Sequence, residues 1–200
     1  MSLTMAEPFG CIVLAAGAGT RFGEPKACAT LPSGERFLDV IVRAAAEAGA
    51  QPIIAVVPDG VLVPPPARTV RNRDSKGEQV VSVRLGLIQL VGTLVRGAFL
   101  WPVDHPFVVS ESVIAMADAH RRTRAHIVLP TYKGRRGHPA FFDRGAWEEL
   151  MTVESGGAQT VVRALGDRVY EVSVDDPGIL QDIDIPSDMP RYAAWRLESD

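Results

Sequence analysis

The sequence has few cysteines, no long apolar run and no large excess of either charge. Cys11 and Cys28 are the two cysteines among 200 residues, and neither their spacing nor their neighbours resemble a metal site or a redox pair. No stretch approaches the ~20 apolar residues of a membrane span, and the N-terminus lacks the basic flank and apolar core of a signal peptide. We therefore expect a cytoplasmic protein with two reduced thiols and no membrane partner.

The charge balance and the apolar content narrow the class of protein. The net charge is −3, whereas a surface that binds duplex nucleic acid usually carries a basic excess, so we expect no nucleic-acid partner. An apolar fraction of 46% over 200 residues is enough for one sizeable core. This predicts a single domain that spans residues 1–200.

Short apolar runs alternate with helical patterns along the chain. Strands are predicted at residues 9–14, 52–57, 97–103, 126–129, 140–142, 169–174 and 179–183. Helices are predicted at residues 37–48, 80–91, 110–122, 143–151, 156–165 and 187–195. Gly49 is expected to end the first helix and Ser110 to cap the third. The alternation predicts a three-layer α/β/α fold with a mostly parallel, Rossmann-like sheet, whose ligands bind beyond the carboxyl ends of its strands.

A glycine-rich stretch, LAAGAGTRFGEPK, occupies residues 14–26 at the end of the first predicted strand. Its three glycines allow backbone N–H groups to point toward one centre, and Arg21 and Lys26 add positive charge there. The GxGxxxG spacing differs from the GxGxxG of dinucleotide-binding proteins, and the stretch lacks the GxxxxGK(S/T) of a P-loop. We predict a polyphosphate-binding loop of another type. A strand-to-helix connection without a ligand is the competing interpretation.

Two acidic segments are candidates for a cation site. Asp104 ends an apolar run between Pro102 and Pro106, at a strand end where a hard divalent cation can sit. Asp182 and Asp184 are two residues apart, so in an extended segment both carboxylates face the same side. Magnesium usually takes only one or two protein carboxylates, and Asp104 with Asp184 would suffice. The competing interpretations are a helix or turn cap for Asp104 and solvated charges for the other two.

Two further segments contain candidate binding residues. Residues 132–138 combine three cations with two glycines and end on His138. Through Arg136 this loop suits the phosphate end of a second substrate, although basic hairpin loops are also often only solvated. His138 can be a general base, a hydrogen-bond donor or a wall of the pocket. Ser82 lies one turn into a predicted helix with a glycine on either side, an arrangement that admits a flat ring or the close packing of the helix itself.

In this order the motifs resemble the nucleotidyltransferases of the molybdenum-cofactor type, the MobA-like NTP transferase family, and within it the molybdenum cofactor cytidylyltransferase-like group. The resemblance covers about residues 10–190 and is carried by LAAGxGTRxGxPK at 14–26, GxxxxSxxxG at 77–86, VDHP at 103–106, RGHPAFF at 136–142 and DIDIPSD at 182–188. It implies a fold of the nucleotide-diphospho-sugar transferase type. It also implies magnesium-dependent transfer of a nucleoside monophosphate, CMP from CTP, to the phosphate of a molybdopterin-type cofactor with release of pyrophosphate.

The resemblance also implies roles for individual residues. Those expected to bind the nucleotide are Leu14, Ala15, Ala16, Gly17, Gly19, Thr20, Arg21, Lys26, Gly77 and Ser82. The expected catalytic residues are Lys26, Arg21 and Asp104. The expected Mg²⁺ ligands are Asp104 and Asp184, and the residues expected to bind the second substrate are Arg136 and His138. Ala16 favours CTP, because relatives that use GTP tend to read LAGG. His105 and Ile185 depart from the family pattern, and these departures bear on substrate identity rather than on the transfer chemistry.

Other functions on the same residues stay open. A guanylyl- or sugar-phosphate nucleotidyltransferase of the same fold would share the glycine-rich loop and the carboxylates. A non-catalytic accessory protein would bind nucleotide or cofactor and deliver it to a molybdenum enzyme such as a molybdenum hydroxylase. A Rossmann oxidoreductase is disfavoured by the GxGxxxG spacing.

Overall fold

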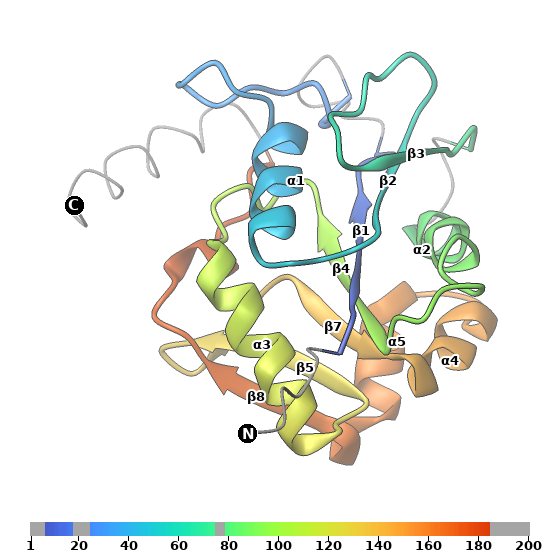
Figure 1. Cartoon of the computed structure of the whole chain (residues 1–200), viewed down its shortest axis with the longest axis vertical. Coiled ribbons are helices and arrows are strands. Elements are labelled where there is room, and N and C mark those ends of the chain that lie inside the picture. The colour runs from blue at the N-terminus through green and yellow to red at the C-terminus, as the bar shows by residue number, and fades with distance from the viewer. Residues whose placement is uncertain (1–6, 18–24, 75–78, 185–200) are drawn as a thin grey trace, which may run out of the picture.

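One eight-stranded sheet organises the computed structural model, which describes residues 7–17, 25–74 and 79–184 (Figure 1). The strands are β1 (Gly10–Leu14), β2 (Ile53–Val57), β3 (Arg68–Arg71), β4 (Gly97–Pro102), β5 (Ile127–Tyr132), β6 (Arg135–Arg136), β7 (Ala140–Asp143) and β8 (Val169–Ser173). The α-helices are α1 (Phe37–Glu47), α2 (Gln79–Ile88), α3 (Ser110–Thr123), α4 (Trp147–Thr152) and α5 (Gly157–Ala164). Three 3₁₀ turns are η1 (Arg144–Ala146), η2 (Gly166–Arg168) and η3 (Pro177–Leu180).

The sheet is mixed, with a parallel half that contains the first strands of the chain. Its order is β3-β2-β1-β4-β7-β5-β6, and β8 pairs with β5. Strands β1 to β4 run parallel to one another, as do β5 and β8, whereas β7 runs antiparallel to both β4 and β5. The carboxyl ends of β1, β2 and β4 therefore meet at one edge, and this arrangement confirms the predicted mostly parallel α/β sheet.

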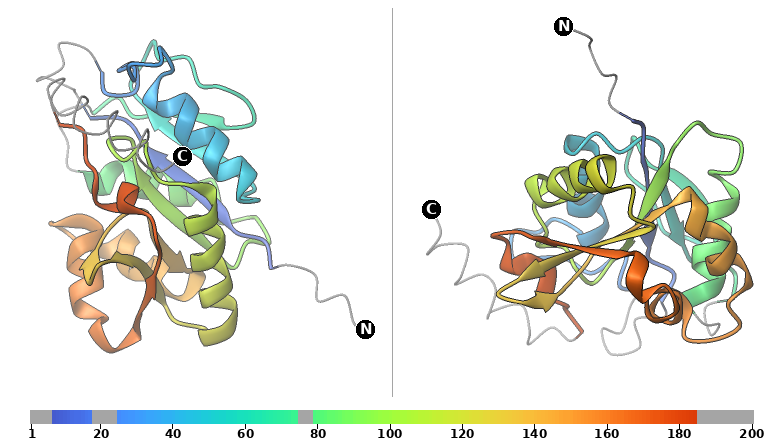
Figure 2. Two further views of the ribbon diagram at one scale, coloured as in Figure 1. Left: turned by 90° about the vertical axis from the view of Figure 1, so that its left-hand side faces the viewer. Right: turned by 90° about the horizontal axis from the view of Figure 1, so that it is seen from below.

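Helices cover both faces of the sheet and give it two cores. On β1, Cys11 and Val13 belong to the core beneath α1 and α3, whereas Ile12 and Leu14 belong to the core beneath α2, α4 and α5. Figure 2 shows these two groups of helices on opposite sides of the strands. Because both faces are covered, a central strand can be apolar at every position, as the GCIVL of β1 is.

The predicted helical periodicities agree with the structure. The residues expected on the buried face of α1, Leu38, Ile41, Val42 and Ala45, are all buried. Gly49 has a φ of +87°, and its N–H donates to the carbonyl oxygen of Ala46, so it ends α1 as expected. In α2, Gly86 serves helix packing, since a Cβ there would lie 2.4 Å from Ile12 Cγ2.

Three sequence-based expectations about local structure need correction or stay untested. Ser110 does not cap α3; the cap position is Val109, and the carboxylate of Asp176 accepts hydrogen bonds from the Val109 N–H and the Ser112 hydroxyl. The strand expected at 179–183 is wrong, because Asp176 accepts from the Gly178 N–H and so begins the 3₁₀ turn η3. The helix expected at 187–195 lies outside the described residues. The sequence does not predict strand β3. Its residues, RTVR, are mostly exposed at the edge of the sheet and therefore lack the apolar pattern of a buried strand.

No helix within the described ranges is long and apolar enough to cross a membrane.

Candidate active site

A lysine and two aspartates meet at the carboxyl edge of the parallel strands. Strands β1 and β4 pair in register up to Leu14 and Pro102, and the Val103 N–H donates to the Leu14 carbonyl oxygen at 3.1 Å. Asp104 therefore leaves β4 directly beside the segment that leaves β1. From the far end of the chain, the Ile183 N–H donates to the Asp104 carbonyl oxygen at 2.8 Å and brings Asp184 to the same place.

Lys26 joins the two carboxylates. Its Nζ donates to Asp184 Oδ1 at 2.6 Å and to Asp104 Oδ2 at 3.2 Å. Burial acts to lower the pKa of Lys26, but the hydrogen bonds and charges of Asp184 and Asp104 outweigh burial and raise that pKa above 10.5. The lysine is thus a fixed positive charge at neutral pH.

The two aspartates form a donor set that suits a hard cation. Asp104 Oδ1 is buried and makes no hydrogen bond within the described parts of the chain, so its lone pairs are free for a ligand. Asp184 accepts a hydrogen bond from Lys26, and this contact distinguishes it from Asp182, which their spacing alone could not do. No cluster of three or more His, Cys, Asp or Glu ligands occurs among the described residues. A cation here would take two carboxylates and complete its shell from water or substrate oxygens, as magnesium usually does.

A cavity of about 220 Å³ opens beside these charges. Its lining consists of Leu14, Ala16, Gly17, Lys26, Asn72, Asp74, Gln79, Ser82, Pro102 and Asp104. The structure thus brings together six predicted site residues from four separate segments. Ala15 is fully buried and does not line the cavity. The predicted residues Gly19, Thr20, Arg21 and Gly77 lie outside the described residues.

A second cavity, of about 510 Å³, lies next to the first and shares Gln79 with it. Its remaining lining consists of Leu129, Arg136, Gly137, His138, Ala140, Phe142, Gly156, Ala158, Gln159, Val162 and Arg163. Both residues predicted for the second substrate, Arg136 and His138, are in this wall. Arg136 is also paired with Glu171 on β8, with its Nε 2.8 Å from Glu171 Oε1. The cavity therefore combines guanidinium groups at its rim with an apolar surface from β5, β7 and α5.

Residues 11–169 match the family of the MobA-like NTP transferase domain. The chain belongs to this family. Among solved structures, Rv0371c from Mycobacterium tuberculosis H37Rv is 23% identical, with a TM-score of 0.78 over 94% of this chain and 98% of that one. A nucleotidyl transferase from Methanothermobacter thermautotrophicus, Mth528, is 21% identical, with a TM-score of 0.75 over 96% and 99% of the two chains.

A cytidylyltransferase shares the fold as well. The 2-C-methyl-D-erythritol 4-phosphate cytidylyltransferase from Thermus thermophilus is 19% identical, with a TM-score of 0.67 over 94% of this chain and 98% of that one. Rv0371c has also been solved as a complex with manganese. No protein of curated function matches this sequence. At these identities the structures confirm the fold of this MobA-like NTP transferase, and the family match confirms the resemblance that its motifs indicated.

Two histidines are in contact beside the carboxylates, and one of them, His138, also lines the second cavity. The rings of His105 and His138 lie 4.5 Å apart between centroids. Burial, together with the neighbouring His138, lowers the pKa of His105 to about 4. The His105 ring is therefore neutral at pH 7, whereas His138 is exposed where it lines the second cavity. Their backbones are fixed, because the His105 carbonyl accepts from Trp101 Nε1 at 3.0 Å and the His138 N–H donates to the Ile179 carbonyl at 2.8 Å.

Sequence reasoning missed four residues of the first cavity, Asn72, Asp74, Gln79 and Pro102. Asn72 is buried and donates from its amide to Ser82 Oγ at 2.9 Å. The signal for Asn72 is its position directly after β3, but the sequence of that short, mostly exposed strand does not predict a strand.

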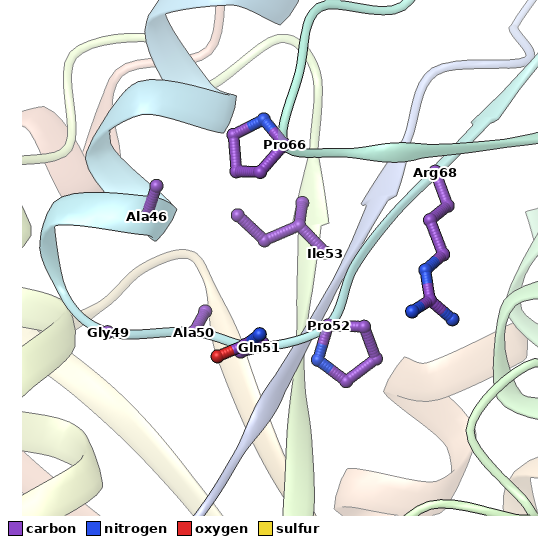
Figure 3. A pocket seen from close by; sticks show the side chains of 8 residues that line it. All are labelled: Ala46, Gly49, Ala50, Gln51, Pro52, Ile53, Pro66 and Arg68. Atoms are coloured by element: carbon purple, nitrogen blue, oxygen red, sulfur yellow. The ribbon is translucent and has the colours of Figure 1, made fainter.

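A third cavity lies at the opposite end of β2, away from the carboxylates (Figure 3). It has a volume of about 310 Å³ and is lined by Ala46, Gly49, Ala50, Gln51, Pro52, Ile53, Pro66 and Arg68. Arg68 is the one charged side chain in this lining, and it is exposed. The position at the amino end of the strand also differs from the crevice that open α/β sheets use for ligands.

Proposed function

We propose that this MobA-like NTP transferase transfers CMP from CTP to the phosphate of a molybdopterin-type cofactor and releases pyrophosphate. The observation that carries the proposal is the position of Lys26 between Asp104 and Asp184, at the side of a cavity that also contains Ala16 and Ser82. Positive charge, carboxylates and a pocket with small residues are the parts that nucleotidyl transfer requires. They lie together at the strand edge where this fold binds ligands.

The protein's own groups position the substrates and stabilise charge, because the reaction needs no protein nucleophile. A phosphate oxygen of the acceptor forms a bond to the α-phosphorus, and the bond from that phosphorus to the bridging oxygen breaks as pyrophosphate leaves. Lys26 would hold the triphosphate as negative charge moves onto the leaving pyrophosphate. A pair of unit charges 4 Å apart is worth about 4 kcal/mol at an effective dielectric constant of ~20, or nearly three powers of ten in rate.

Asp104 and Asp184 are the proposed ligands of a divalent cation, Mg²⁺. The unpartnered buried Oδ1 of Asp104 supports a ligand there, and the hydrogen bond from Lys26 to Asp184 supports Asp184 rather than Asp182 as the second ligand. When bound, Mg²⁺ would supply charge neutralisation at the phosphate oxygens. The structure of Rv0371c in complex with manganese supports divalent-metal binding by a protein of this fold.

The second cavity is the proposed acceptor site. Its apolar surface, which includes Phe142 and Val162, suits a flat heterocycle, and Arg136 and Arg163 supply charge for a phosphate. Because the two cavities share Gln79, an acceptor in one would face a nucleotide in the other. The product would pass to a molybdenum enzyme such as a molybdenum hydroxylase, and the proposed location is the cytoplasm.

A second acceptor class is favoured by one observation, the likeness to 2-C-methyl-D-erythritol 4-phosphate cytidylyltransferase. A sugar- or polyol-phosphate acceptor would use the same loop and carboxylates. Guanylyl transfer and non-catalytic cofactor binding are the remaining alternatives.

Nucleotide binding and turnover together test the proposal. Thermal denaturation with CTP, GTP, ATP or UTP, each with Mg²⁺, should show the largest stabilisation with CTP. A ligand at a hundred times its dissociation constant adds about 2.7 kcal/mol to the free energy of unfolding. Pyrophosphate release with CTP and molybdopterin cofactor should follow, and release with an erythritol phosphate instead would identify the second acceptor class. Tight binding without pyrophosphate release would indicate an accessory protein.

A further inference from the structure

We propose that Asn72 is a positioning residue that fixes the Ser82 hydroxyl as a hydrogen-bond donor toward the nucleobase, so that the pocket selects a base with an acceptor at that point. The inference rests on the proposed function, since it takes Ser82 to be part of the nucleotide site. It goes beyond that function by naming the group that sets the polarity of the contact.

The two side chains form a buried pair between different elements. Asn72 follows β3 and is 4% exposed, while Ser82 lies in α2 and is 5% exposed. Both line the cavity beside Lys26. Asn72 Nδ2 lies 2.9 Å from Ser82 Oγ. Both side chains are therefore part of the cavity wall and almost fully buried, so water competes little for the hydrogen bond between them.

The orientation of the Asn72 amide is set on its other side. Asn72 Oδ1 accepts the backbone N–H of Asp74 at 2.9 Å, and the Asn72 backbone N–H donates to the Val57 carbonyl at 3.0 Å. Because an N–H must face an acceptor, the oxygen of the amide points to Asp74 and its NH₂ points to Ser82. The flipped amide would place NH₂ against N–H and leave both donors unsatisfied.

This orientation leaves Ser82 with a hydrogen to donate. A hydroxyl has one donor and two acceptor lone pairs, and the amide of Asn72 occupies one lone pair. Within the described parts of the chain, that contact is the hydrogen bond that Ser82 Oγ makes. The hydroxyl hydrogen is therefore available to the occupant of the cavity. An occupant with only an N–H group at that point cannot accept this hydrogen bond, because both groups are donors.

Nucleobases differ at this point in their chemistry. Cytosine presents two adjacent acceptors, N3 and O2. Uracil shares the O2 acceptor but carries N3–H in place of the N3 lone pair, and the corresponding edge of guanine carries N1–H and an amino group. The proposed contact of the Ser82 hydroxyl is therefore with N3, where the bases differ. A buried donor discriminates strongly, because the mismatched base leaves both polar groups unpaired in a site without water. The Asn72–Ser82 pair accordingly selects cytosine over uracil and guanine.

The substitution Asn72→Asp tests the inference with little change in shape. The carboxylate keeps one oxygen for the Asp74 N–H and turns the other into an acceptor for the Ser82 hydroxyl, so Ser82 presents only lone pairs to the base. The measured quantity is the ratio of kcat/KM for CTP to kcat/KM for UTP. We expect this ratio to fall about ten- to a hundredfold. Ser82→Ala should lower it comparably, the double variant should lower it no further, and Ser82→Thr should retain it.

The matched control is Arg73→Gln, which changes the net charge by the same amount one residue away. Arg73 is exposed and does not line the cavity, so this variant should keep the ratio of the unaltered protein. If Asn72→Asp does not fold, Asn72→Ala releases the hydroxyl from its partner and should move the ratio toward that of Ser82→Ala. Circular dichroism and the melting temperature establish that each variant is folded.

The outcomes separate this inference from the proposed function. If Ser82→Ala lowers the ratio and the folded Asn72 variants do not, the inference is overturned while the nucleotide site stands. If none of these variants changes the ratio, the inference is overturned and the base binds elsewhere. If the unaltered protein turns over no nucleotide, the proposed function itself has failed.

Discussion

Lys26 Nζ donates to Asp104 Oδ2 at 3.2 Å and so joins the segment that follows the glycine-rich stretch to the carboxyl end of β4. Strand register places Asp104, because the Val103 N–H donates to the Leu14 carbonyl oxygen where β1 and β4 end side by side. The lysine also holds Asp184, so one ammonium group organises both proposed metal ligands. Changes at these three residues should therefore alter the metal response and the transfer rate.

Asp104→Asn keeps the size of the side chain but removes the charge that Lys26 and a cation need. We expect the rate of pyrophosphate release to fall about a hundredfold or more, with an unchanged circular dichroism spectrum. Asp182→Asn, at an exposed carboxylate close in sequence to Asp184, is the control and should retain most of the activity. Full activity in Asp104→Asn would remove the metal and charge roles assigned to this carboxylate.

Lys26→Met leaves Asp104 and Asp184 facing each other without a cation between them. Two neighbouring carboxylates without a cation between them repel each other and destabilise the fold, so the melting temperature should fall in a chelating buffer. Added Mg²⁺ or Mn²⁺ should then raise the melting temperature of this variant more than that of the unaltered protein. Lys133→Met, at an exposed lysine in the hairpin turn, provides the comparison. An identical metal response in Lys26→Met and in the unaltered protein would contradict the shared cation site.

Asp176→Asn should change how stability depends on pH. Burial, with a small contribution from Glu111, raises the pKa of Asp176 above 3.8 despite three hydrogen bonds to its carboxylate. A carboxyl whose folded pKa is raised contributes stability that is full below the unfolded pKa and is lost as the pH rises through the folded pKa. The unfolding free energy of the unaltered protein, minus that of the variant, should therefore decrease as the pH rises from about 4.

Urea denaturation at several pH values from about 4 to about 7 measures this difference. Asp175→Asn, at the exposed neighbouring carboxylate, should give a difference from the unaltered protein that varies much less with pH. A difference for Asp176→Asn that grows with pH would show that the hydrogen bonds outweigh burial and that the sign is wrong.

Gly137→Ala and Gly178→Ala test how tightly η3 is held. A Cβ on Gly137 would lie 2.3 Å from the Ile179 carbonyl oxygen, and one on Gly178 would lie 2.3 Å from that of Phe107. Backbone cannot yield as a side chain does, so each change should cost about 1–3 kcal/mol of unfolding free energy. Gly166→Ala meets no atom within 4 Å and should stay within about 0.5 kcal/mol. Equal stabilities of all three variants would show that η3 can shift freely.

Much of the fold could be predicted because its signals are local. The apolar run of β1 and the periodicity of α1 each reflect burial against neighbours that cover those residues, and Gly49 ends α1 through its own conformation. The family resemblance was also local, since each motif is a short segment. These are the features that one stretch of sequence can determine.

The remaining features depend on partners far along the chain. Asp176 caps α3 from 67 residues away, which no pattern around Ser110 could indicate. Asp182 and Asp184 are two residues apart, so in an extended segment both face the same side and the sequence does not distinguish them. In the structure the Ile183 N–H donates to the Asp104 carbonyl oxygen, and Asp184 is the aspartate that accepts from Lys26. The place of Asn72 in the cavity could not be predicted for a similar reason, because its side chain bonds to Ser82, which lies on another element.

Transfer itself is the most direct test of the central claim that the Lys26–Asp104–Asp184 site performs nucleotidyl transfer. The measurement is pyrophosphate release from CTP with Mg²⁺ and molybdopterin cofactor, with mass spectrometry of the product and Asp104→Asn run in parallel. The account predicts a cytidylated cofactor from the unaltered protein, preference for CTP over the other three nucleotides, and a loss of about a hundredfold or more in the variant. Binding of CTP and cofactor without pyrophosphate release, or equal rates in the two proteins, would contradict it.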